Sequence, residues 1–180
     1  MKSFTKPALK LAETVAAAMI ATMFLTFLLQ IGVRYSARLE WIADWFPLLE
    51  PANFGWTLEL CLALWVWLIF WGNSFVVRDQ DHVKFDVFYT QVPPGVRKWF
   101  VVLSGVSICV GLLLSLEPTL GKFHVLRLKK TATLSAVFGD WIRMRDVYFI
   151  YVVFLVAVSA RYGWRVFKAV RYGVEERIEE

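Results

Sequence analysis

The sequence predicts an all-α integral membrane protein in which four helices cross the bilayer. Four stretches of the 180-residue chain contain no charged residue, namely 14–33, 60–77, 99–116 and 147–160. A helix needs roughly 20 mainly apolar residues to span the hydrocarbon core. The chain is also 58% hydrophobic with nine Trp, whereas soluble domains are roughly 45–50% apolar. We therefore predict a single four-helix transmembrane domain, 1–180, with spans near 12–34, 57–78, 97–117 and 145–167.

The first apolar run is expected to be a retained anchor rather than a cleaved signal peptide. Its length exceeds the roughly 7–15 apolar residues of a secretory signal. The chain leaves it through Arg34, Tyr35 and Ser36, where no pair of small residues marks a cleavage site. Beyond it, Leu39, Ile42, Trp45, Phe46 and Leu49 recur at helical spacing. This spacing predicts a short interfacial helix in the first loop.

The second span carries aromatic residues on one helical face, which includes Trp67, Phe70 and Trp71. Trp prefers the edges of a membrane, so several indoles inside the hydrocarbon favour contact with a protein partner. Contact with lipid is the alternative. In the third span, Ser107, Gly111 and Ser115 are spaced by four. Small residues at this spacing let helix backbones approach closely, so we predict helix packing within the bundle there.

The fourth span is short, and basic residues follow it. Arg161 and Arg165 can extend their guanidinium groups to the headgroups while the neighbouring aromatic residues lengthen the apolar column. Together with Lys168 and Arg171 they form one stripe of a basic C-terminal helix. Such a stripe suits anionic lipid at a cytoplasmic surface. A solvated charged face is the alternative interpretation.

The distribution of Lys and Arg predicts the orientation. The N-terminal segment, the second loop and the C-terminal tail together carry more of them than the first and third loops. The positive-inside rule therefore places both termini in the cytoplasm. The exception is a basic group in the third loop, on the expected outer side, formed by Lys122, Arg127, Lys129 and Lys130.

The spans lack the groups that transport or catalysis within one chain requires. Charged side chains at mid-membrane are costly and mark ion or proton pathways, but Glu13 and Glu59 lie at helix ends. The two histidines, His82 and His124, lie outside the apolar runs, which argues against haem ligation within the bundle. No nucleotide-binding, zinc or nucleophile motif is present. We expect no enzyme activity, no cofactor, no metal site and no nucleic-acid partner.

The most specific pattern begins at the second span and continues into the loop after it. In order and spacing it resembles the small membrane subunit (Q subunit) of tripartite ATP-independent periplasmic (TRAP) transporters. The matching positions are Trp56, Glu59, Trp67, Gly72, Arg78, Asp81, His82, Val83, Lys84, Phe85 and Asp86. The departures are Leu62 and Gln80, where the family often has Arg and Gly, and the absence of proline from 131–139.

The resemblance implies a bacterial inner-membrane complex. In it a large membrane subunit would carry an organic acid, coupled to sodium, and a periplasmic binding protein would deliver the substrate. The small subunit would brace the large one, and the aromatic face at Trp67, Phe70 and Trp71 would contact it. The basic group of the third loop would dock the binding protein; clamping of lipid headgroups is the alternative. A membrane anchor for another complex remains a second hypothesis, and an autonomous small multidrug exporter a third.

Overall fold

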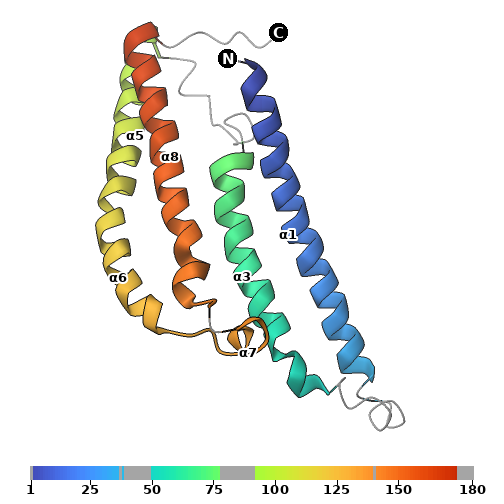
Figure 1. The fold of residues 1–180 in the computed structure, drawn as a ribbon. Coiled ribbons are helices and arrows are strands. Elements are labelled where there is room, and N and C mark those ends of the chain that lie inside the picture. The colour runs from blue at the N-terminus through green and yellow to red at the C-terminus, as the bar shows by residue number, and fades with distance from the viewer. Residues whose placement is uncertain (1, 37, 39–49, 78–91, 140, 174–180) are drawn as a thin grey trace. The chain divides into compact units, whose positions relative to one another are not determined.

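The chain is mainly helical in the part that the structure describes, which comprises residues 2–36, 38, 50–77, 92–139 and 141–173 of a computed structural model (Figure 1). Within these residues no strand occurs, and a single antiparallel bridge joins Lys130 to Arg143. The prediction of an all-α chain is thus confirmed. Its elements are α1 (Lys2–Ser36), the 3₁₀-helix η2 (Pro51–Phe54), α3 (Gly55–Trp71), the π-helix η3 (Gly72–Val76), α5 (Pro94–Leu114), α6 (Leu116–Leu128), α7 (Leu134–Phe138) and α8 (Met144–Tyr172).

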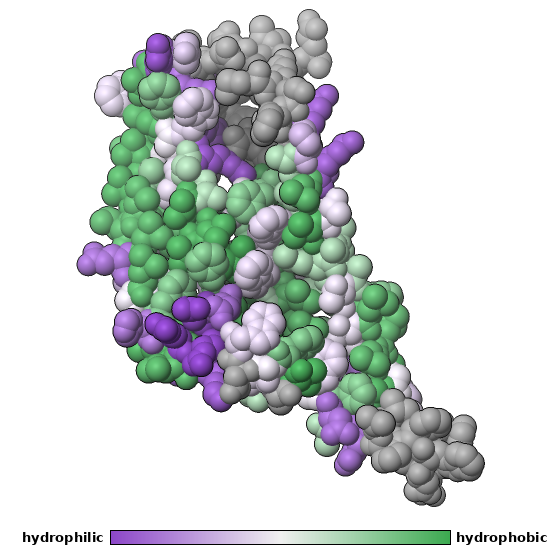
Figure 2. Space-filling view, viewed as in Figure 1, coloured by the Kyte–Doolittle hydropathy of each residue, from purple (hydrophilic) through white to green (hydrophobic). Residues whose placement is uncertain are grey.

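Four helical segments in this part of the chain are long and apolar enough to cross a membrane, as predicted. They are Lys6–Ser36, Pro51–Val76, Gly95–Leu128 and Met144–Tyr172. Many of their large apolar side chains are exposed, and Figure 2 shows hydrophobic residues covering the helices. Exposed apolar surface on this scale suits a chain whose surroundings are lipid or other membrane helices.

The third segment is longer than expected, because α6 follows α5 almost without interruption. The main chain bridges the junction at Ser115, whose amide donates to the Gly111 carbonyl and whose carbonyl accepts from the Thr119 amide. Pro118 lies in the first turn of α6, where a missing N–H removes little from the helix. The helix therefore continues past residue 117, where the span was predicted to end. Lys122 and Arg127 lie on α6 rather than in a loop.

The chain divides into two compact units, each described by itself. Unit 1 comprises Met1–Val76 and Lys122–Tyr151, and unit 2 comprises Val77–Gly121 and Val152–Glu180. In unit 1, α3 lies along α1 and contacts α7 near its own N-terminal end (Figure 1). The fully buried side chains of unit 1 include Ile150 of α8 and Thr57 of α3. The prediction that residues 1–180 form a single domain stays a prediction.

Unit 2 contains a close approach of two helices at Gly105 of α5. A Cβ at this position would lie 2.5 Å from Cγ2 of Val166 on α8, a distance that forces a shift of the neighbouring side chain. One turn further along α5, the Cys109 thiol lies 3.5 Å from the Ser159 carbonyl oxygen. Gly163 faces the same thiol, and a Cβ added there would lie 3.8 Å from the Cys109 Sγ. These residues form the packing seam of unit 2.

The predicted small-residue stripe lies outside this seam. Ser107 and Gly111 are exposed, and a Cβ added at Gly111 would meet no atom within 4 Å. The hydroxyl of Ser115 donates to the Gly111 carbonyl of its own helix. The seam of unit 2 is therefore at Gly105, which lies on another side of α5. Packing of Ser107, Gly111 and Ser115 against another helix of the bundle stays a prediction.

Two further predictions fall outside the described residues. The interfacial helix predicted at 39–49 is one of them. The loop pattern that contains Arg78, Asp81, His82 and Asp86 is the other. The basic stripe from Arg161 to Arg171 is described, and it belongs to α8 itself rather than to a separate C-terminal helix.

Candidate functional site

The carboxylate of Glu59 holds the segment that leads into α7. Glu59 lies in the second turn of α3, and its two oxygens accept four hydrogen bonds. The donors are the amides of Ala132, Thr133 and Leu134, at 2.8, 2.7 and 2.7 Å, and the Thr133 hydroxyl at 2.8 Å. Three of these groups are main-chain amides at the start of a helix, which have no partner within it. Glu59 thus caps α7 from a distant part of the sequence.

Side chains also pack around this carboxylate, between α3 and α7. We call the junction of the two helices the α3–α7 latch and define it by Glu59 and residues 131–138. The Trp56 ring meets the Phe138 ring edge to face, with centroids 5.7 Å apart. A Cβ at Gly55 would lie 3.4 Å from Cγ2 of Thr133. Leu134 is 3% exposed. Two residues of the family pattern, Trp56 and Glu59, therefore act together at one end of α3.

The aromatic face predicted for a partner is engaged within unit 1. The Trp67 indole N–H donates to the Val147 carbonyl of α8, and the Trp71 indole N–H donates to the Ala12 carbonyl of α1, each at 3.0 Å. Phe70 meets Tyr151 edge to face, with centroids 5.2 Å apart. An indole N–H inside a membrane needs an acceptor, and here neighbouring main chain supplies it. Contact of these three residues with a large subunit stays a prediction.

Gly72, another residue of the family pattern, marks a change of helix type. It ends α3 and begins η3, a five-residue π-helix. No atom lies within 4 Å of where its Cβ would stand, so close packing does not require glycine here. Short π-helical segments occur frequently at functional sites. The rest of the pattern, from Arg78 onward, follows this element and is outside the described residues.

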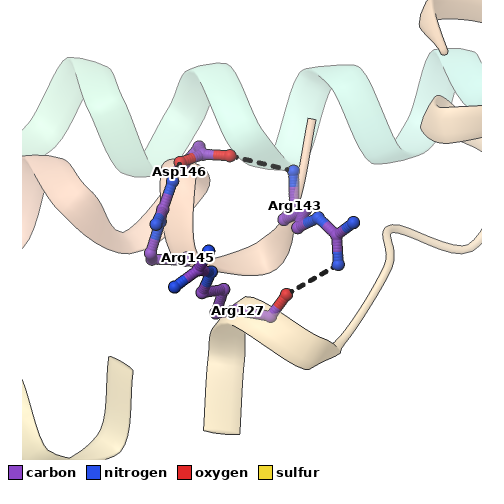
Figure 3. Close-up of polar contacts among 4 residues, drawn as sticks. All are labelled: Arg127, Arg143, Arg145 and Asp146. Carbon is purple, nitrogen blue, oxygen red and sulfur yellow. Dashed lines mark hydrogen bonds and ion pairs between the residues drawn. The ribbon is translucent and has the colours of Figure 1, made fainter. Parts of the chain in front are cut away.

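The basic group of the third loop lies where α6 ends and α8 begins (Figure 2). Lys122, Arg127, Lys129 and Lys130 are all exposed. The Met144 amide donates to the Lys129 carbonyl at 3.2 Å, which ties the two ends together. In Figure 3, the Arg143 guanidinium donates to the Arg127 carbonyl at 2.9 Å, and Asp146 accepts from the Arg143 amide at 3.1 Å. These contacts hold the main chain at Arg127 and Lys129 against the start of α8.

The Asp146 carboxylate, in the first turn of α8, makes two contacts. It accepts from the Arg143 amide just ahead of the helix, which is the arrangement of a helix N-cap contact. It also forms an ion pair with Arg145 at 3.0 Å, and both side chains are more than two-fifths exposed. Exposed pairs of this kind contribute little to stability. The surface around them therefore stays predominantly basic.

Arg161 behaves differently from the sequence-based expectation of a side chain extended to headgroups. Within unit 2 its guanidinium donates to the Val77 carbonyl at 3.1 Å, directly after the last residue of η3. Such a contact satisfies a carbonyl that a helix end leaves open. The Lys98 ammonium similarly lies 3.2 Å from the Val170 carbonyl, near the end of α8. Arg165, Lys168 and Arg171 are exposed.

The described residues contain no cluster of three or more His, Cys, Asp or Glu side chains that could hold a metal ion. Sequence reasoning located Glu59 but missed its partners at 132–134, because the two segments are far apart in the chain. The available signal was the pair Thr131 and Thr133 between α6 and α7, since threonine favours helix starts and turns. Gly105 was also missed, since a single glycine inside an apolar run has no distinctive pattern.

Comparison with known proteins decides the family. The family model of the DctQ component of tripartite ATP-independent periplasmic transporters matches residues 23–171. The chain belongs to this family. A curated relative is the C4-dicarboxylate TRAP transporter small permease protein DctQ of Rhodobacter capsulatus, which is 27% identical over 143 residues, or 68% of the chain. The aligned part covers 61% of that relative's length. No solved structure matches the chain.

This membership agrees with the resemblance seen in the sequence. The family is one of transporter subunits and not of enzymes. It also agrees with the four apolar helices, which indicate a multi-pass protein of the inner membrane. The family match includes both α3, with Glu59 and its aromatic residues, and the α7 segment that Glu59 caps.

Proposed function

We propose that this chain is the small subunit that braces the large membrane subunit of a TRAP transporter during sodium-coupled uptake of an organic acid. The supporting observation is the use of Glu59, an ionisable side chain within the apolar segment Pro51–Val76. Its four hydrogen bonds all come from the chain itself. A carboxylate committed to capping a helix is a structural group, not one that takes up and releases a coupling ion.

The proposal assigns substrate and sodium to the large subunit and delivery of substrate to a periplasmic binding protein. The small subunit then supplies a fixed surface against which the large subunit moves. Both termini would lie in the cytoplasm, as the distribution of Lys and Arg suggests. The α3–α7 latch and the basic group of the third loop would then lie on the periplasmic side. The exposed Lys129 and Lys130 would attract an acidic surface of the binding protein.

Reconstitution tests this function. Liposomes that contain this chain alone should take up no organic acid, with or without a sodium gradient. Liposomes that contain the chain with the large subunit should show uptake once the binding protein and sodium are added. Sodium-driven uptake by the chain alone would contradict the proposal. So would full activity of the large subunit and binding protein without this chain.

A further inference from the structure

Helix α3 has a second face that the rest of unit 1 leaves open. Leu58, Leu62, Trp65 and Ile69 follow one another at helical spacing and are 56, 59, 53 and 41% exposed. Leucine and isoleucine on such a face suit lipid as well as protein. Trp65 does not, because it lies near the middle of the apolar segment Pro51–Val76 and carries a polar N–H.

The three tryptophans of the inner part of α3 differ in what their N–H groups meet. Trp67 and Trp71 each donate to a main-chain carbonyl of a neighbouring helix at 3.0 Å. Trp65 has no acceptor for its N–H within the part of the chain that the structure describes. Hydrocarbon tails offer no acceptor, and water is scarce at that depth. Leaving the group unpaired there is unfavourable.

We propose that the face defined by Leu58, Leu62, Trp65 and Ile69 packs against a helix of the large membrane subunit, which presents a main-chain carbonyl or hydroxyl to the Trp65 indole. This inference rests on the proposed function and names the surface through which the chain braces its partner. The contacts of Trp67 and Trp71 demonstrate that a helix main chain can accept such a bond. Small side chains expose these carbonyls, as at Ala12.

A second copy of the same face fits this requirement less well than the large subunit does. A two-fold pair would bring identical surfaces together, and large side chains cover the main chain on this face. The indole would then meet apolar side chains and no acceptor. A helix of a different protein, with small or hydroxyl residues at the contact, can pack closely against this face and accept a hydrogen bond from the Trp65 N–H.

Photocrosslinking in the assembled complex tests the proposal. A benzophenone amino acid replaces Trp65, or Leu103 of α5 as a control, since Leu103 is 66% exposed. Each variant is co-expressed with the large subunit and irradiated in native membranes. We expect a covalent heterodimer with the large subunit from position 65 and a much weaker one from position 103. Adducts from position 65 with lipid alone, or with a second copy of this chain, would overturn the inference.

A matched pair of conservative variants separates the N–H from the apolar surface. Trp65→Phe should lower the amount of large subunit that co-purifies by about two- to tenfold, the range of one net hydrogen bond. The stability of the isolated chain should stay unchanged. Trp67→Phe should instead lower the stability of the isolated chain, because its bond lies within unit 1. Equal co-purification of Trp65→Phe and the wild type would overturn the inference.

The wild-type complex distinguishes the two levels of the proposal. If the unmodified chain does not co-purify with the large subunit, the proposed function fails and this inference fails with it. If the unmodified complex forms but position 65 yields no heterodimer, the function stands and the inference alone fails.

Discussion

Different kinds of contact stabilise the interior of each of the two units. In unit 1, polar side chains reach across to main chain: Glu59 binds the amides before α7, and Trp67 and Trp71 bind helix carbonyls. In unit 2, the seam between α5 and α8 depends on a missing side chain at Gly105. Unit 1 is therefore sensitive to the loss of a hydrogen-bonding atom, whereas unit 2 is sensitive to added volume.

This difference follows from the environment of a membrane helix. Burial of apolar surface drives association weakly in lipid, so helices associate through close packing and through hydrogen bonds. A glycine allows close packing, and a carboxylate or an indole provides a hydrogen bond. The glycine matters most in the α5–α8 seam of unit 2, and the hydrogen bonds matter most around α3 in unit 1. We expect that either can be removed without affecting the other.

The largest effect is expected from Gly105→Leu. The added side chain would overlap Val166, because even a Cβ would lie 2.5 Å from its Cγ2. Overpacking of this kind costs about 3 kcal/mol, so thermal unfolding of the purified chain in detergent should occur at a clearly lower temperature. Gly111→Leu is the control and should unfold at nearly the wild-type temperature, since the site is open. Equal destabilisation by both variants would contradict the assigned seam.

A smaller effect is expected from Glu59→Gln. The amide keeps the size of the carboxylate but loses its charge and one acceptor, while its NH₂ group opposes the donors of 132–134. Loss of a charge-assisted bond of this kind costs about 2 kcal/mol, measured by the same thermal unfolding. Glu117→Gln serves as the control because Glu117 is exposed at the start of α6. An unchanged unfolding temperature for Glu59→Gln would show that the latch contributes nothing.

Replacing Trp67 or Trp71 should lower the thermal stability less than Gly105→Leu or Glu59→Gln does. Trp67→Phe and Trp71→Phe each remove one N–H that donates to a carbonyl, at an expected cost of about 0.5–1 kcal/mol in a membrane protein. Trp99→Phe is the control, since Trp99 is 73% exposed. The unfolding temperature should fall slightly for the first two variants and not for the third. A fall confined to Trp99→Phe would reverse the assignment of the inner face.

The smallest effect on stability is expected from reversing the exposed charges Lys129→Glu and Lys130→Glu together. The unfolding temperature should stay near that of the wild type, but transport at limiting binding protein should slow. Saturating binding protein or high salt should reduce the difference, because the Debye length is only about 8 Å at physiological ionic strength. Equal slowing under all conditions would favour contact of these lysines with lipid headgroups.

The sequence predicts the spans well and the contacts poorly, for a physical reason. Uncharged runs reveal membrane segments because the bilayer penalises charge wherever it lies along a helix. Helix α6 continues past the predicted end of the third span, and it contains Lys122 and Arg127, which were interpreted as loop residues. On a helix, long basic side chains can extend toward the headgroups, so charge alone does not end a helix.

The faces of the helices were harder to predict than their ends. Trp67, Phe70 and Trp71 were predicted to contact a protein partner, and the structure shows the two indoles donating to main chain of the same chain. Ser107 and Gly111 were predicted to pack within the bundle, and the close approach within unit 2 lies at Gly105. Periodicity identifies residues that share a face. It does not say which neighbour that face meets, because the neighbour is distant in sequence.

Hydrogen–deuterium exchange of the wild-type chain and Glu59→Gln tests the contrast between the two units most directly. The Glu59 carboxylate holds the amides of Ala132, Thr133 and Leu134. We expect these three amides to exchange faster in Glu59→Gln, while peptides from the α5 seam around Gly105 keep their wild-type rates. Unchanged exchange at 132–134 would contradict the latch. Faster exchange throughout α5 as well would contradict the claim that the two units are stabilised independently.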